Sequence, residues 1–190
     1  MRAMVLPATV SLDQNPSPLV PVDMAMPEPG KGEVLIEISV CGVCHTELDE
    51  IEGRTPPPVL PVVPGHEIVG NVVELGPGCR KRTIGERVGI GWIHSSTGGD
   101  DENLSEEFRA TGRDVDGGYA EFVVVPETYA FPLPAEFSDA EAAPLLCAGG
   151  VGYRSLRLAN IEDGQVLGLT GFGGSGHLVL QLSLIHISEP

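Results

Sequence analysis

The stretch EVLIEISV at residues 33–40 decides the fold of the first part of the chain, because apolar and polar side chains alternate along it. That period is typical of a β-strand with one buried face. Three further stretches have strand character: EIVGNVVEL (67–75), RVGIGW (87–92) and YAEFVVV (119–125). Glycine and proline separate these stretches, with five prolines in residues 55–64 alone. The sequence therefore predicts a β-barrel or β-sandwich over residues 1–135.

The character of the chain then changes. Two stretches have helical composition, 138–148 and 152–159. Ser138, followed by Glu141 three positions later, forms the pattern of a helix-capping box. The stretch QVLGLT (165–170) has the composition of a short buried strand, and the glycine-rich turn GFGGSG (171–176) follows it before a helix that begins near His177. A second domain is therefore expected to open near residue 160.

Other features have simple structural interpretations. Two segments are expected to be loops, the proline-studded residues 16–29 and the polar, acidic residues 93–113. Cys79 follows a Gly-Pro-Gly turn and is interpreted as a turn residue. Trp92 is expected in the core or at the wall of a pocket. The run Asp100-Asp101-Glu102 is interpreted as a solvated acidic loop.

Composition limits the classes of function. The 190 residues include 11 basic and 27 acidic side chains, which gives a formal net charge of −16. Such a surface repels phosphate backbones and anionic lipids, so nucleic-acid and membrane-surface roles are disfavoured. No apolar stretch is long enough for a membrane span, and the start MRAMVLPATV lacks a signal-peptide core. A cytoplasmic location is expected.

Cysteine and histidine residues suggest a metal site. In a reducing compartment, cysteines serve metal binding, catalysis or simple burial before disulfides. The Cys-x-x-Cys spacing of Cys41 and Cys44 suits a metal site, a redox pair or incidental burial. A catalytic zinc needs three protein ligands and an open position. Cys44, His66 and Cys147 supply such a set if their segments converge. Simple burial explains the Cys-x-x-Cys pair equally well, and His66 or Cys147 taken alone is more often structural.

The glycine turn has the spacing of a dinucleotide-binding fingerprint, Gly171-x-Gly173-x-x-Gly176. The first glycine permits a tight turn, the second permits close approach of a pyrophosphate, and the third permits strand–helix packing. A glycine-rich turn without a ligand is the alternative. The acidic residue expected about 20 positions later falls beyond Pro190.

Taken together, these segments resemble the zinc-dependent alcohol dehydrogenases of the medium-chain dehydrogenase/reductase superfamily. The resemblance extends from Met1 to Leu182. Six motifs in the right order carry it: CGVCHTEL (41–48), LPVVPGHEIVG (60–70), GERVGIGW (85–92), DVDGGYAEFVVVP (114–126), EAAPLLCAGGVGYRSL (141–156) and GLTGFGGSGHLVLQL (168–182).

This resemblance implies a fold that is α+β and then α/β. Residues 1–158 would form a GroES-like β-barrel catalytic domain, and residues 159–182 the beginning of a truncated Rossmann NAD(P)-binding domain. Residues 183–190 (SLIHISEP) do not continue the amphipathic helix of family members. They resemble translated sequencing-adapter sequence and are expected to be a non-native tail.

The resemblance also assigns site residues. Cys44, His66 and Cys147 would bind the catalytic zinc, with the carboxylate of Glu67 beside the metal, whereas Cys41 matches a non-ligand position. Thr46 matches the hydroxyl that passes on the substrate proton. Residues expected at the cofactor are His45 near the pyrophosphate and the turn glycines Gly171, Gly173, Gly174 and Gly176.

Two departures from the family pattern change the expectations. The stretch 93–108 contains no cysteine, and Ser105 stands where the last cysteine of a second, structural zinc site would be. One zinc is therefore expected, not two. Asp49 occupies the position where many family members have the histidine that completes the proton path.

The first functional hypothesis is an enzyme that interconverts an alcohol and an aldehyde or ketone with NAD or NADP. The expected partners are a small-molecule substrate and, for the full-length form, further copies of itself. The present chain is expected to be an inactive fragment. A zinc-free quinone or enoyl reductase and a non-catalytic GroES-like binding module are the alternatives.

Overall fold

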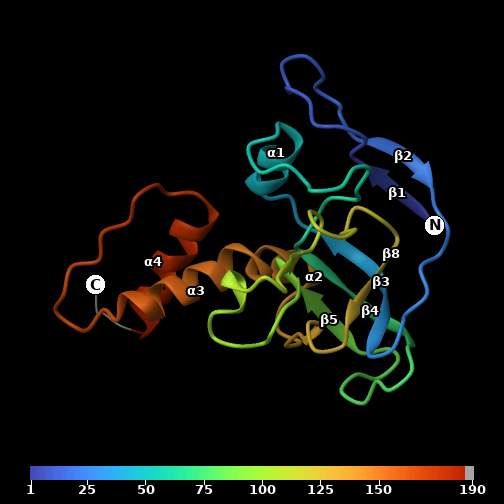
Figure 1. The fold of residues 1–190 in the computed structure, drawn as a ribbon. Helices are drawn as coiled ribbons and strands as arrows, with labels where there is room; N and C mark the ends of the chain where they lie inside the picture. The colour runs from blue at the N-terminus through green and yellow to red at the C-terminus, as the bar shows by residue number, and fades with distance from the viewer. Residues whose placement is uncertain (187–190) are drawn as a thin grey trace.

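A five-stranded antiparallel sheet forms the centre of the computed structural model, which describes residues 1–186 (Figure 1). Its strand order is β8-β3-β4-β5-β9. The strands are β3 (Glu33–Cys41), β4 (Ile68–Leu75), β5 (Arg87–Ile90), β8 (Phe122–Pro126) and β9 (Phe131–Pro132). All four stretches with strand character contribute a strand, so the prediction of a β-rich first part is confirmed.

Two short hairpins flank the sheet, and they correct the two expected loops. β2 (Val20–Asp23) lies inside the proline-studded segment and pairs with β1 (Arg2–Val5). β6 (Ile93–Ser95) and β7 (Arg109–Ala110) enclose the 3-10 helix η1 (Glu102–Leu104) within the acidic segment. Strands of two to four residues show too little alternation to be recognised from sequence.

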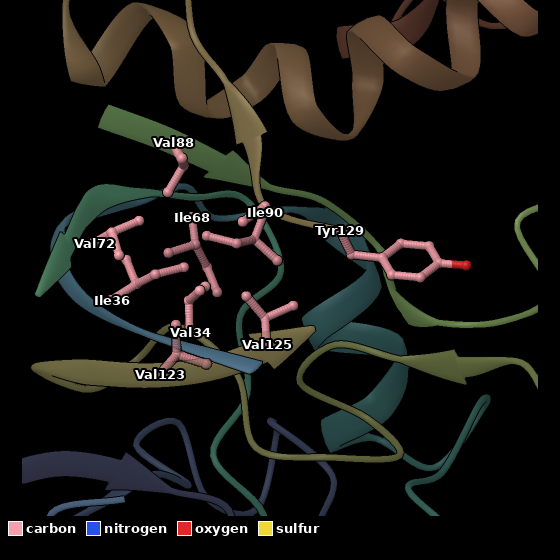
Figure 2. Packing of buried hydrophobic residues seen from close by; sticks show 10 residues of the cluster. Val34, Ile36, Ile68, Val72, Val88, Ile90, Val123, Val125 and Tyr129 are labelled. Carbon is pink, nitrogen blue, oxygen red and sulfur yellow. The ribbon is translucent and has the colours of Figure 1, made fainter. Parts of the chain in front are cut away.

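The main core lies on one face of the sheet (Figure 2). Alternate residues of each strand point into it, as with Val88 and Ile90 of β5, which are fully buried. The buried members are Val34, Ile36, Ile68, Val72, Val88, Ile90, Val123, Val125, Tyr129 and Ala130. Each buried Val or Ile side chain stabilises the fold by about 1.5–3 kcal/mol.

Helices connect and extend the sheet. They are α1 (His45–Ile51), α2 (Asp139–Ala142), the 3-10 helix η2 (Ala143–Leu146) and α3 (Ala148–Ala159). The predicted capping box is present at α2, where the backbone N–H of Ser138 donates to Oε2 of Glu141 at 2.9 Å. None of the helices within residues 1–186 is both long and apolar enough to cross a membrane.

The expected strand at residues 165–170 is not formed. This stretch is mostly exposed, and Val166 is 95 % exposed. A parallel strand needs neighbouring strands and covered faces, and no strand of residues 1–186 pairs with it. The glycine turn and the helix after it are formed.

That helix, α4 (Gly174–His186), packs beside α3 through Val179, next to Gly152 (Figure 1). α4 extends past Leu182, so residues 183–186 of the expected tail are helical. The rest of the expected non-native tail lies outside the described residues. The domain limits at residues 158 and 182 remain predictions.

Candidate metal centre

Four side chains from three distant segments meet beside the sheet: Cys44, His66, Glu67 and Cys147. One ligand atom of each residue lies within 4.8 Å of the corresponding atoms of the others. His66 and Glu67 are buried, and the two cysteines are half-buried. The structure thus brings together all four residues that the resemblance placed at the metal.

The pairing of β3 with β4 explains why two of these segments converge. Cys41, the last residue of β3, lies opposite Ile68, the first residue of β4. The backbone N–H of Gly42 donates to the carbonyl of Glu67 at 2.8 Å. The loop after β3, which ends in Cys44 at the N-terminus of α1, is therefore held against His66 and Glu67.

Cys147 reaches the centre from the junction of η2 and α3. Its Sγ lies 3.9 Å from Sγ of Cys44, much too far for a disulfide bond of about 2.05 Å. Two sulfur atoms bound to one tetrahedral zinc at about 2.3 Å lie roughly 3.8 Å apart. The observed separation therefore fits a shared metal ion.

The imidazole of His66 has one supported nitrogen and one free nitrogen. Nδ1 lies 2.6 Å from Oε1 of Glu47, an ion-pair distance. Nε2 is buried and has no hydrogen-bond partner among the described residues. A carboxylate on one imidazole nitrogen and an unpaired second nitrogen form the arrangement typical of a metal-binding histidine.

Glu47 is a site residue that sequence reasoning missed. Its second oxygen, Oε2, accepts a hydrogen bond from the backbone N–H of Cys44 at 2.8 Å. An acidic residue three positions into a helix is a capping signal visible in the sequence. Its contact with His66 was not visible, because that contact depends on the approach of the β4 segment.

The centre favours a thiolate at Cys44. The thiol of Cys147, and then the nearby imidazole of His66, lower the pKa of Cys44 to about 3. The pKa of Cys147 is raised, because its thiol donates to the Cys44 sulfur and because it is buried. Burial lowers the pKa of His66, but the Cys44 thiolate and Glu47 outweigh it and raise the pKa to about 10. A thiolate beside an acidic cluster is an attractive environment for a cation.

Cys41 lies outside this cluster. Burial raises its pKa to about 12, and its Sγ packs beside Gly65 and Gly118. The Cys-x-x-Cys spacing suits a metal site, a redox pair or incidental burial, and for Cys41 the structure agrees with burial. Glu50 is a second buried carboxylate that sequence reasoning missed, and it is only 1 % exposed.

The residues expected to move a proton lie on α1. Sγ of Cys44 lies 3.5 Å from Oγ1 of Thr46, so the hydroxyl is next to the cluster. Oδ1 of Asp49 binds Nε of Arg54 at 2.5 Å and lies 3.8 Å from Nε2 of His45. The side chain of His45 is 76 % exposed.

An apolar cavity of about 460 Å³ opens beside the cluster. Its walls include Trp92, Phe131, Leu146, Cys147, Val151 and Leu158. The ring of Trp92 meets the imidazole of His66 edge-on, with centroids 5.0 Å apart. Of the two positions considered for Trp92, the pocket wall is the one observed.

The glycine turn has the backbone that its sequence predicts. Gly171 has a φ of +80°, and a side chain at Gly173 would meet no atom within 4 Å. The N-terminus of α4 begins at Gly174, and a Cβ at Gly176 would lie 2.9 Å from the carbonyl of Gly171. The backbone therefore requires glycine at Gly171 and Gly176, although the strand expected before the turn is not formed.

Comparisons with known proteins agree with this geometry. Residues 30–135 match the family described as the alcohol dehydrogenase GroES-like domain. A probable alcohol dehydrogenase of Mycobacterium tuberculosis is 44% identical over 183 residues, 90% of this chain and 53% of the relative. An alcohol dehydrogenase of Geobacillus stearothermophilus is 40% identical over 177 residues, 90% of this chain and 52% of the relative.

Solved structures show the same similarity. A cobalt- and zinc-bound alcohol dehydrogenase from Pyrobaculum aerophilum is 27% identical, with a TM-score of 0.87, over 100% of this chain and 58% of that one. An NADP(H) complex from Helicobacter pylori is 28% identical, with a TM-score of 0.82 and the same coverage. The chain spans about half the length of the relatives it matches. It belongs to the alcohol dehydrogenase GroES-like domain family.

Proposed function

We propose that this chain carries the metal-binding catalytic domain of a zinc-dependent alcohol dehydrogenase, which interconverts an alcohol and an aldehyde or ketone with NAD or NADP. The convergence of Cys44, His66 and Cys147, with Glu67 beside them, carries the proposal. Two cysteines and one histidine form the catalytic zinc set known for alcohol dehydrogenases, which leaves a fourth position open.

The donor set fits zinc better than the alternatives. Thiolate and imidazole ligands suit zinc, and the buried Nε2 of His66 has no other partner among the described residues. Bound there, zinc supplies a Lewis acid that lowers the pKa of an alcohol oxygen, and a nicotinamide supplies the hydride acceptor.

The chain's own residues would bind the substrate and move its proton. The apolar cavity against Trp92 and Leu146 would hold the substrate's carbon skeleton and exclude water from it. Oγ1 of Thr46, next to Cys44, would accept the alcohol proton.

We assign the carboxylate of Asp49 to the step of the proton path that follows Thr46. Its carboxylate is bound by Arg54, so proton transfer through it must compete with an ion pair. His45, on the same turn of α1, has an exposed imidazole that would meet a cofactor phosphate.

The glycine turn would hold the cofactor pyrophosphate once its strand is in place. We propose that a complete Rossmann sheet, such as the full-length relatives would supply, orders residues 165–170. The described part of the chain contains one turn and one helix of that domain, so we propose that the chain alone is inactive.

Metal analysis of the purified chain tests the proposal. One zinc per chain is expected, Cys44→Ser should abolish binding, and Cys41→Ser, the matched control from the same motif, should retain it. Loss of zinc in Cys41→Ser but not in Cys44→Ser would contradict the ligand assignment. A chain that binds no zinc at all would favour the zinc-free reductase or the binding module.

A further inference from the structure

One face of β5 packs against the segment that leads to Cys147. The strand begins Arg87-Val88-Gly89-Ile90, and Gly91 follows it. Val88 and Ile90 point into the core and are fully buried. Because side chains alternate along a strand, Arg87, Gly89 and Gly91 share the opposite face.

The two glycines leave room for Leu146, the last residue of η2. A Cβ atom at Gly89 would lie 2.6 Å from Cδ2 of Leu146, and a Cβ atom at Gly91 would lie 2.7 Å from the backbone carbonyl oxygen of Leu146. Real Cβ atoms essentially never come closer than 3.0 Å to such neighbours. At Gly91 the contact is with backbone, so η2 can lie this close to β5 only because Gly91 lacks a side chain. At Gly89 the contact is with the end of the Leu146 side chain, which fills the space that a Cβ atom would take.

Arg87 fixes the beginning of the same segment. Its Nε donates to Oδ1 of Asp139 at 2.7 Å, and its Nη1 and Nη2 donate to the carbonyls of Pro134 and Phe137 at 3.0 and 2.9 Å. The segment from residue 134 to residue 146 is thus held on β5 at both ends.

The next residue along the chain is Cys147. It has φ −117° and ψ −77°, at the joint where η2 ends and α3 begins. Its place is therefore set by how deeply Leu146 lies against β5. At the observed depth, Sγ of Cys147 reaches 3.9 Å from Sγ of Cys44.

We propose that Gly89 and Gly91 are positioning residues for the metal: the side-chain-free face of β5 sets the depth of Leu146 and so brings the thiol of Cys147 to Cys44. This inference rests on the proposed function, because it requires a metal ion held by Cys44, His66 and Cys147. It adds two residues, outside the ligand set, on which metal binding depends.

Gly91→Ala and Gly89→Ala test the inference in the purified chain. Zinc affinity is measured by competition with a chelator, and thiolate coordination by the sulfur-to-cobalt charge-transfer band after loading with Co²⁺. Gly91→Ala, whose Cβ would strike the backbone of Leu146, should lower zinc affinity by about 10-fold or more and weaken the cobalt band. Gly89→Ala, whose Cβ would strike the end of the Leu146 side chain, should do both to a smaller extent. Gly99→Ala is the matched control, because its Cβ would meet only ordinary contacts at 3.5 Å and beyond.

A second substitution separates positioning from general damage. Leu146→Ala removes the nearest atoms that a Cβ at Gly89 would strike and leaves only the end of the Leu133 side chain, at 3.0 Å. It should therefore restore zinc affinity and the cobalt band to Gly89→Ala. It should not restore them to Gly91→Ala, where the clash is with a backbone oxygen. If Gly91→Ala does not fold, Gly89→Ala with and without Leu146→Ala decides.

Unchanged zinc affinity and an unchanged cobalt band in both glycine variants would overturn the inference and leave the metal site standing. Failure of Leu146→Ala to restore Gly89→Ala would also overturn it. A chain that binds no zinc before any substitution would overturn the proposed function, and this inference with it.

Discussion

Glu47 and His66 form a buried pair, with Oε1 of Glu47 2.6 Å from Nδ1 of His66. The other carboxylate oxygen of Glu47 accepts a hydrogen bond from the backbone N–H of Cys44. One carboxylate therefore holds two of the proposed zinc ligands, which lie on different segments. It orients the imidazole and fixes the start of α1 at the same time.

Glu47→Gln should weaken zinc binding by about 10- to 100-fold, the usual effect of losing a carboxylate behind a metal-binding histidine. The amide keeps the size of the side chain but loses the negative charge beside the imidazole. Zinc affinity measured by chelator competition checks this. Glu121→Gln, which changes an exposed partner of Arg2, is the control, and equal affinity in both variants would contradict the role of Glu47.

Much of the sheet could be predicted because β3 lies in a stretch with an alternating pattern and β4, β5 and β8 lie in short apolar stretches that glycine and proline separate. The resemblance supplied the set Cys44, His66, Glu67 and Cys147, and the structure brings them together. Glu47 and Glu50 could not be found in the same way. Their burial depends on the segment before β4 lying against α1, and that contact leaves no local pattern in the sequence.

The strand expected at residues 165–170 shows the opposite limit. Its composition suits a buried strand, but burial requires partners that composition cannot supply. Within residues 1–186 no such partners are present, and the stretch is exposed. The turn at Gly171 formed nevertheless, because its conformation depends on glycine itself.

Glu50 should make the zinc-free chain less stable as the pH rises. Burial, and then the charge of Glu47, raise its pKa from 4.5 to about 8. Below pH 4.5 the proton is present in both the folded and the unfolded state. Between about 4.5 and 8 only the folded state keeps it, so the stability it contributes is lost as the pH rises through 8.

Glu50→Gln should remove this loss. One pKa unit corresponds to about 1.4 kcal/mol, and 1 kcal/mol shifts the melting temperature of a chain this long by roughly 2–4 °C. The melting temperature of Glu50→Gln, relative to that of the unaltered zinc-free chain, should therefore increase by at least about 3 °C between pH 5 and pH 8.5. Glu28→Gln, at an exposed position, should show no such growth. If the melting temperatures of Glu50→Gln and of the unaltered chain change by the same amount between pH 5 and pH 8.5, the prediction is refuted.

Tyr129 should stabilise the acidic segment without affecting the metal. Its hydroxyl donates to Oε2 of Glu102 at 2.8 Å and accepts from the backbone N–H of Ser96 at 3.0 Å. The side chain of Glu102 is thus hydrogen-bonded to Tyr129. The interpretation of residues 100–102 as a solvated acidic loop is therefore wrong for Glu102. The segment has no cysteine with which to bind a second zinc.

Tyr129→Phe should cost about 0.5–1.5 kcal/mol in urea unfolding. The half-buried N–H of Ser96 loses its acceptor, whereas Oε2 of Glu102 loses one donor and keeps the backbone N–H of Gly98. Zinc content should stay at one per chain. Tyr153→Phe, on the exposed side of α3, is the matched control and should cost much less. A Tyr129→Phe chain that loses its zinc would show that this segment supports the metal centre after all.

The chain should bind NADH weakly and should not oxidise alcohols. A dinucleotide crevice needs two βαβ halves and a paired sheet, and the strand that should precede the glycine turn is unformed and exposed. The turn can therefore contact one phosphate group, but it has no strand to hold it in register with an adenosine or a nicotinamide. Fluorescence titration with NADH and an alcohol oxidation assay check this, and the Helicobacter pylori relative solved with NADP(H), titrated with NADPH, is the positive control. Zinc binding should persist in the same preparation, because all four residues of the cluster lie before α3. Saturable NADH binding in the micromolar range together with measurable turnover would show that the single turn and helix are sufficient.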